Sequence, residues 1–152
     1  MPSELLDAAL STAHFIAVLI IAGALATQAF LLRAPLSKSS LLVLARSDLF
    51  YGLAAVALII FGASRVEFGL RGHDFYFASH AFWGKIAVFT IIGLLSIQPT
   101  MKFRAWRKAA RADEHFAPPE IDVKSVRRFV MIEVHLLALV VIFAALMARG
   151  IG

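Results

Sequence analysis

Seven ionisable side chains stand inside or at the edges of long apolar stretches of this sequence, where an ionised group is costly. They are His14, Asp48, Arg65, His80, Lys85, Glu133 and His135, with Gln28 and Gln98 as neutral polar additions. Insertion into a membrane core costs each ionisable group roughly 2.5–3.5 kcal/mol, so such groups usually face a partner or a cavity. So many of them in one short chain indicate a polar interior that carries out chemistry or transport.

The histidines are the first candidates for cofactor chemistry. Membrane b-type cytochromes hold haem through imidazole ligands on separate apolar helices. His14, His80 and His135 are candidates for this role, and the cationic Arg65 and Arg71 are candidates for pairing with haem propionates. The spacing alone is weak evidence, because a lone membrane histidine is more often a packed, hydrogen-bonded residue.

Several other chemistries are excluded by the residues that the sequence lacks. There is no cysteine, which rules out disulfides, thiolate metal sites and cysteine nucleophiles. The sequence also has no HExxH pair, no carboxylate-rich set for two metals and no GxSxG elbow. It has no glycine-rich phosphate loop either, which argues against a nucleotide-driven pump.

Four apolar segments are long enough to position these groups across a bilayer, which takes roughly 20 residues per helix. We expect the spans at 5–32, 45–65, 77–98 and 127–148, with a helix boundary or kink at Pro99 and with Asp122 capping the last helix. Of the 152 residues 61% are hydrophobic and 16% charged, whereas a soluble domain is nearer half apolar and a quarter charged. The prediction is an all-α, single-domain integral membrane four-helix bundle over 1–152.

Lysines and arginines gather in the first and third connections, and the third holds a basic amphipathic segment at 100–117. The positive-inside rule makes these connections cytoplasmic and puts the N- and C-termini outside. We expect the segment 100–117 to follow the cytoplasmic surface and contact anionic lipid head groups, although a solvated topology signal would look the same. Basic residues that flank apolar segments indicate the lipid bilayer, and not nucleic acid, as the partner.

Depth along the predicted spans separates the candidate residues. At 1.5 Å per residue, His14 lies roughly 12 Å below the outer end of the first span, and Lys85 lies a similar distance into the third. His14 and Lys85 are therefore expected to meet in the outer leaflet. His80 is shallower and could be an interfacial histidine, whereas His135 and Glu133 lie nearer the cytoplasmic side.

Four runs of residues carry a family resemblance. They are Trp83-Gly84-Lys85-Ile86-Ala87-Val88-Phe89, Leu95-Ser96-Ile97-Gln98-Pro99-Thr100, Asp48-Leu49-Phe50-Tyr51-Gly52 and Gly62-Ala63-Ser64-Arg65. Together they resemble an uncharacterised bacterial family of predicted four-helix membrane proteins, a domain of unknown function. That family is in turn distantly similar to the HemJ-type protoporphyrinogen oxidases and the CopD-type copper-resistance membrane proteins.

The resemblance to HemJ-type proteins implies residue roles. In that family a histidine early in the first helix and a lysine early in the third are functional and are associated with b-type haem. His14 and Lys85 occupy those positions, and Glu133 resembles an acidic residue of the fourth helix. His135 has no place in the pattern. The resemblance therefore implies haem b in a bacterial cytoplasmic (inner) membrane, and it does not extend to the oxidation of protoporphyrinogen.

The leading hypothesis is a membrane-embedded, b-type haem-binding redox protein of unknown substrate. His14 would be one axial ligand of the haem iron and His135 or His80 the second. Arg65 would pair with the propionates. Lys85 would lie beside the porphyrin and, with Glu133, take part in catalysis, which would need a membrane or periplasmic electron-transfer partner.

Two alternatives from other classes stay open. In the first, the chain is a small metal or proton transporter or a copper-handling protein, in which Asp48, Lys85, Glu133 and the histidines form a path. A chain of this length makes a thin path unless it forms a homodimer. In the second, the chain is a non-enzymatic structural or assembly subunit whose buried charges pair with each other, for example Lys85 with Glu133 or Asp48.

Overall fold

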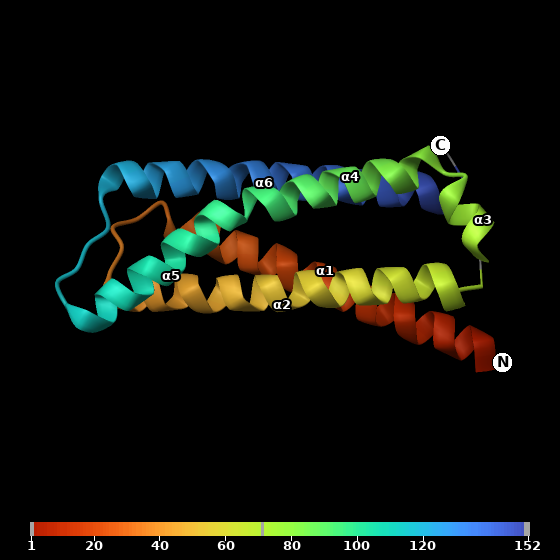
Figure 1. Cartoon of the computed structure of the whole chain (residues 1–152), viewed down its shortest axis with the longest axis horizontal. Helices are drawn as coiled ribbons and strands as arrows, with labels where there is room; N and C mark the ends of the chain where they lie inside the picture. The colour runs from red at the N-terminus through yellow and green to blue at the C-terminus, as the bar shows by residue number, and fades with distance from the viewer. Residues whose placement is uncertain (1, 71, 151–152) are drawn as a thin grey trace.

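The computed structural model describes residues 2–70 and 72–150, and in that part of the chain all regular structure is helical (Figure 1). Arg71 lies outside the described residues, so its expected pairing with a propionate is not placed. The helices are α1 (Pro2–Leu31), α2 (Lys38–Phe68), α3 (Gly72–Phe77), α4 (His80–Leu95), α5 (Ile97–Ala112) and α6 (Glu120–Ala148).

Four helical stretches are long and apolar enough to cross a membrane. They are Ser3–Leu31, Lys38–Phe68, His80–Ala112 and Glu120–Ala148. Large apolar side chains such as Leu19, Ile59 and Leu94 point outward, with 59–70% of their surface exposed. Lipid is as apolar as these side chains, so a membrane helix can leave them uncovered. The predicted all-α fold is confirmed, and its four long apolar helices are consistent with a four-span membrane bundle.

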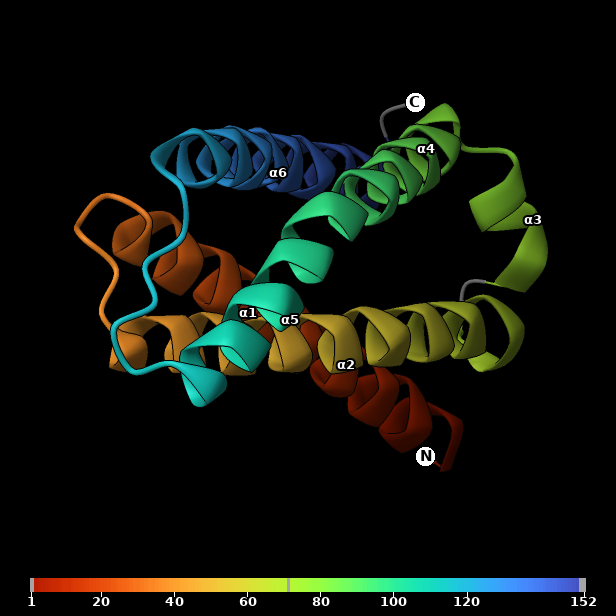
Figure 2. The same ribbon diagram turned by 60° about the vertical axis from the view of Figure 1, so that its left-hand side comes forward.

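The helices form two pairs, α1 with α2 and α4 with α6 (Figure 1). The start of α1 and the end of α6 lie toward the same end of the bundle as α3, which joins the pairs at what we call the α3 end (Figure 1). The opposite end, here the α5 end, holds the connections at 32–37 and 113–119, and there α5 crosses α2 (Figure 2). Phe103 and Trp106 of α5 are buried in this crossing, so the apolar face of the basic segment packs on protein.

The break between α4 and α5 falls at Ser96, three residues before Pro99. A proline ring clashes with the carbonyl of the fourth residue before it, here Leu95, and lacks the N–H that would bond to that carbonyl. Ser96 still donates its backbone N–H to Ile92 at 2.9 Å, and its hydroxyl donates to the Gly93 carbonyl at 2.8 Å. The proline therefore turns the helix without unfolding it, and α5 leaves the direction of α4 to reach α2.

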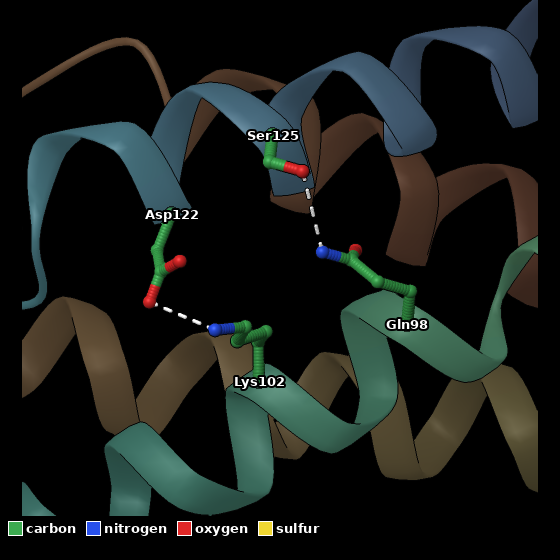
Figure 3. Close-up of polar contacts among 4 residues, drawn as sticks. All are labelled: Gln98, Lys102, Asp122 and Ser125. Atoms are coloured by element: carbon green, nitrogen blue, oxygen red, sulfur yellow. Dashed lines mark hydrogen bonds and ion pairs between the residues drawn. The ribbon is translucent and has the colours of Figure 1, made fainter.

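Asp122 does not cap α6, so that prediction is wrong. The helix begins earlier, with Pro119 in the cap position and Asp122 already in the first turn, because the fixed φ of a proline suits a helix start. Asp122 instead accepts a hydrogen bond from Lys102 Nζ of α5 at 2.8 Å (Figure 3). Gln98 Nε2 donates to Ser125 Oγ at 3.4 Å beside it. The two contacts tie α5 to the start of α6.

Gly69 is expected to be intolerant of a side chain. It ends α2, and its N–H donates to the Arg65 carbonyl at 3.0 Å. An added Cβ would overlap that carbonyl oxygen and come within 3.1 Å of Asp7 Oδ1. We expect Gly69→Ala to cost roughly 1–3 kcal/mol of stability, measured by detergent-solubilised unfolding in SDS. Gly93→Ala is the control, because a Cβ there meets nothing within 4 Å; equal stability of the two variants would contradict this cap geometry.

Candidate functional site

Polar side chains in the bundle interior, some half-buried and some fully buried, form two groups at different heights of the bundle. We call the first the histidine cluster; it consists of His14 of α1, Arg65 of α2 and Lys85 of α4. The second, the carboxylate cluster, lies nearer the α5 end and consists of Asp48 and Tyr51 of α2, Thr100 of α5 and Glu133 of α6.

His14 is held against a glycine of the neighbouring helix. A Cβ on Gly62 of α2 would lie 3.6 Å from His14 Cε1 and 3.7 Å from Nδ1, so the imidazole occupies the space that a larger side chain would take. Nδ1 of His14 is buried and has no hydrogen-bond partner in the described part of the chain. A buried polar atom without a hydrogen-bond partner destabilises the folded protein. The imidazole ring of His14 therefore packs against Gly62, but its Nδ1 atom lacks a hydrogen-bond partner among the described residues.

Two cations flank this imidazole. Lys85 and Arg65 both lie close enough to His14 to act on it electrostatically, as the predicted meeting of His14 and Lys85 requires. Lys85 Nζ is 5.2 Å from the centre of the Phe82 ring, a cation–π distance. Among the described residues neither cation forms a salt bridge with a carboxylate, and Arg65 Nε is buried without a partner. The cluster thus holds two basic side chains without an acidic partner, an arrangement that suits an anionic ligand.

The histidine cluster lies where the two helix pairs separate. Within the described residues, no Cα atom of α4 lies within 8 Å of a Cα atom of α1 or α2. The backbone of α4 is therefore not in close contact with the α1–α2 pair. Lys85 extends from α4 on its long flexible stem, whereas His14 and Arg65 come from the α1–α2 pair.

The other two candidate histidines are placed elsewhere. His135 is exposed on α6, and its Nδ1 contacts the Met131 carbonyl of its own helix at 2.6 Å. Glu133, two residues earlier, is 1% exposed and faces inward, and two residues correspond to about 200° around a helix. His80 is exposed as the first residue of α4. Of these three histidines, the structure brings only His14 to the two cations.

The carboxylate cluster contains two hydrogen bonds between helices, one from α2 to α6 and one from α5 to α2. Tyr51 donates its hydroxyl to Glu133 Oε2 at 3.0 Å, and Glu133 Oε1 is buried with no partner among the described residues. Thr100 donates its hydroxyl to Asp48 Oδ1 at 2.8 Å. Asp48 is also near enough to Glu133 to interact electrostatically. Two carboxyl groups thus share one buried polar region.

The structure separates residues that were predicted to act together. Lys85 and Glu133, the predicted catalytic pair, belong to different clusters, and the suggested pairing of Lys85 with Glu133 or Asp48 does not occur in the described structure. Thr100 and Gly62 belong to runs that carry the family resemblance, but neither was predicted to be a site residue. The one signal in the sequence that Thr100 faces another helix is its position directly after Pro99, where the helix changes direction.

Metal coordination by side chains alone finds no support in the described residues. No group of three or more histidine, aspartate or glutamate side chains there could hold a metal ion. A haem brings four ring nitrogens of its own and needs only one or two protein ligands, so this observation bears on simple metal sites and not on haem.

Comparison with known proteins identifies a family. Residues 6–152 match the family described as predicted membrane protein (DUF2214), and the chain belongs to this family. No curated protein and no solved structure matches the chain. The description names a membrane protein and no activity, so the function must be argued from the residues.

Proposed function

We propose that this member of the DUF2214 family is a membrane redox protein that binds a b-type haem beside His14, between its two helix pairs. The observation that carries the proposal is the histidine cluster, an imidazole with an unpartnered nitrogen flanked by two cations that lack an acidic partner. A b-type haem offers iron to an imidazole and two propionates to cations. When bound, it would supply one-electron transfer.

Each residue of the histidine cluster has a distinct part in this proposal. His14 would bind the iron, with Gly62 leaving room for its ring. Arg65 and Lys85 would offset the charge of the propionates, which is costly to bury in a membrane unless it is paired. His14 and Lys85 also stand where the resemblance to HemJ-type proteins leads us to expect the haem-associated pair.

The placement of the histidines supports a five-coordinate haem. His80 and His135 lie on exposed surfaces, so His14 would be the sole protein ligand from the described residues of the cluster. Held by His14 alone, the haem would be accessible to small ligands such as carbon monoxide. This refines the initial expectation of a second histidine ligand.

The proposal includes an orientation in a bacterial cytoplasmic membrane. Lysines and arginines concentrate in the connections and in α5 at the α5 end, which favours a cytoplasmic location for that end and an outside location for both termini. The haem would then lie in the outer half of the membrane. There a membrane or periplasmic electron-transfer partner can approach it.

An absorption spectrum tests the proposal. The full chain is expressed with a haem precursor, purified in detergent and measured oxidised, reduced with dithionite, and reduced under carbon monoxide. We expect a Soret band that shifts on reduction and a single broad visible band in the reduced protein. Carbon monoxide should then shift the Soret band further and give separate alpha and beta bands. A featureless spectrum from well-folded protein would contradict haem binding, and a reduced spectrum that carbon monoxide leaves unchanged would contradict five-coordination.

The carboxylate cluster favours a second candidate, proton or cation transport. Two buried carboxyl groups and a tyrosine hydroxyl connect α2, α5 and α6, and acidic residues inside membranes often mark ion paths. A colourless protein that carries protons into liposomes, with the flux lost in Glu133→Gln, would support this candidate over the redox protein. Altered copper tolerance of a deletion strain would point to copper as the cargo.

A further inference from the structure

A groove of about 430 Å³ lies between α2 and α5 at the α5 end. Its two walls differ in chemistry. The wall from α2 is apolar and includes Leu49, Leu53 and Val56, whereas the wall from α5 is polar and includes Thr100, Arg104 and Arg107. Asp48 and Thr100 of the carboxylate cluster are among its lining residues, but that cluster does not account for an opening with one apolar and one cationic wall.

The apolar wall has the dimensions of a lipid chain. Leu49, Leu53 and Val56 form one stripe on α2, and each has 55–60% of its surface exposed. Between them Gly52 leaves a trough, because a Cβ there would meet nothing within 4 Å. From Ala45 to Val56 the lining covers roughly 16 Å of helix at 1.5 Å per residue, close to the ~15 Å depth of one leaflet of the hydrocarbon core.

The cationic wall is available to a ligand. Among the described residues neither Arg104 nor Arg107 forms a salt bridge, whereas Lys102 on the same helix is engaged with Asp122. The one carboxylate in the lining is Asp48, which is 7% exposed and accepts the hydrogen bond from Thr100. Two guanidinium groups against one carboxylate leave one net positive charge. Guanidinium groups match the geometry of phosphate oxygens.

We propose that this groove binds one molecule of an anionic phospholipid. The phosphate would lie against Arg104 and Arg107, and one acyl chain would follow the trough on α2 past Gly52. An exposed apolar stripe alone describes any lipid-facing helix. Here a second helix adds two unpaired cations at its edge, so the groove is complementary to both parts of an anionic lipid. The proposal is independent of haem, because no residue of the histidine cluster lines the groove.

Native mass spectrometry of the full chain, released from detergent with phosphatidylglycerol or with phosphatidylcholine of the same acyl chains, tests the proposal. We expect retention of one phosphatidylglycerol and much weaker retention of phosphatidylcholine. Arg104→Gln/Arg107→Gln should weaken phosphatidylglycerol binding about 30-fold, since each cation near an anionic lipid surface contributes on this scale. Gly52→Leu should also weaken it by filling the trough.

Matched controls come from the same protein. Arg127→Gln/Arg128→Gln removes two exposed arginines of α6, and Gly93→Leu adds the same side chain at an exposed glycine of α4; both should bind phosphatidylglycerol like the wild type. Equal binding by the groove variants and the wild type would overturn the proposal. So would displacement of the lipid by equimolar inorganic phosphate, or a dimer that Gly52→Leu dissociates while lipid binding persists.

Discussion

The His14→Ala variant is expected to purify without a Soret band from cells in which the wild-type chain is loaded with haem. Alanine removes the one imidazole that lies beside Arg65 and Lys85, and neither cation can replace it as a ligand while it remains charged. The measurement is the ratio of Soret to protein absorbance after expression with a haem precursor. Size-exclusion chromatography and the helical circular dichroism signal establish that the variant is folded.

Two further variants separate ligation from general damage. His135→Ala should keep its Soret band, because that side chain is exposed and contacts the Met131 carbonyl of its own helix. Gly62→Leu should lose the band although His14 is still present, because the new side chain takes the space of the imidazole. A wild-type spectrum from His14→Ala would remove His14 from the role, and loss of haem in His135→Ala alone would move the ligand to α6.

The Tyr51→Phe variant is expected to have a free energy of unfolding about 1–3 kcal/mol lower than that of the wild type. The change removes the hydroxyl that donates to Glu133 Oε2 at 3.0 Å and leaves both oxygens of a buried carboxyl group without a partner among the described residues. The ring itself keeps its volume, so packing is unchanged. The free energy of unfolding is measured by SDS titration of the detergent-solubilised protein, followed by circular dichroism.

A double-mutant cycle with Glu133→Met provides the control. Replacing both members of a buried polar pair with apolar groups of similar shape is often close to neutral, whereas removing one member is not. Tyr51→Phe/Glu133→Met should therefore be more stable than Tyr51→Phe alone, with a coupling energy above about 0.5 kcal/mol. Additive effects of the two changes would show that the hydrogen bond between Tyr51 and Glu133 contributes no coupling.

Local properties of the sequence were enough to predict the helices. The length and hydropathy of a helix are properties of a single segment of the sequence, so they predict the four long apolar helices. The effect of Pro99 is also local, because the ring acts on the carbonyl only four residues away. The path of α5 was not predictable in this way. Burial of Phe103 and Trp106 against α2 depends on a helix that is distant in the sequence.

For the candidate site, the sequence could predict only how deep each residue lies along its helix. Depth along a helix follows from residue number, so the approach of His14 to Lys85 could be anticipated. Rotation about the helix axis does not follow from it. Glu133 and His135 are two residues apart and cannot both face inward, and the sequence contained no rule for choosing between them. The contact of Tyr51 with Glu133, 82 residues apart, likewise requires the pairing of α2 with the rest of the bundle.

The division into two helix pairs also determines when the histidine cluster can form during synthesis. α1 and α2 are consecutive and pair directly, so His14 and Arg65 can come together as soon as the first hairpin has entered the membrane. α4 pairs with α6, which follows it in the sequence, and chains emerge from the amino end. Lys85 therefore reaches its final position only after α6 has been made, and cofactor loading that depends on Lys85 would select chains that contain α6 over chains that stop before it.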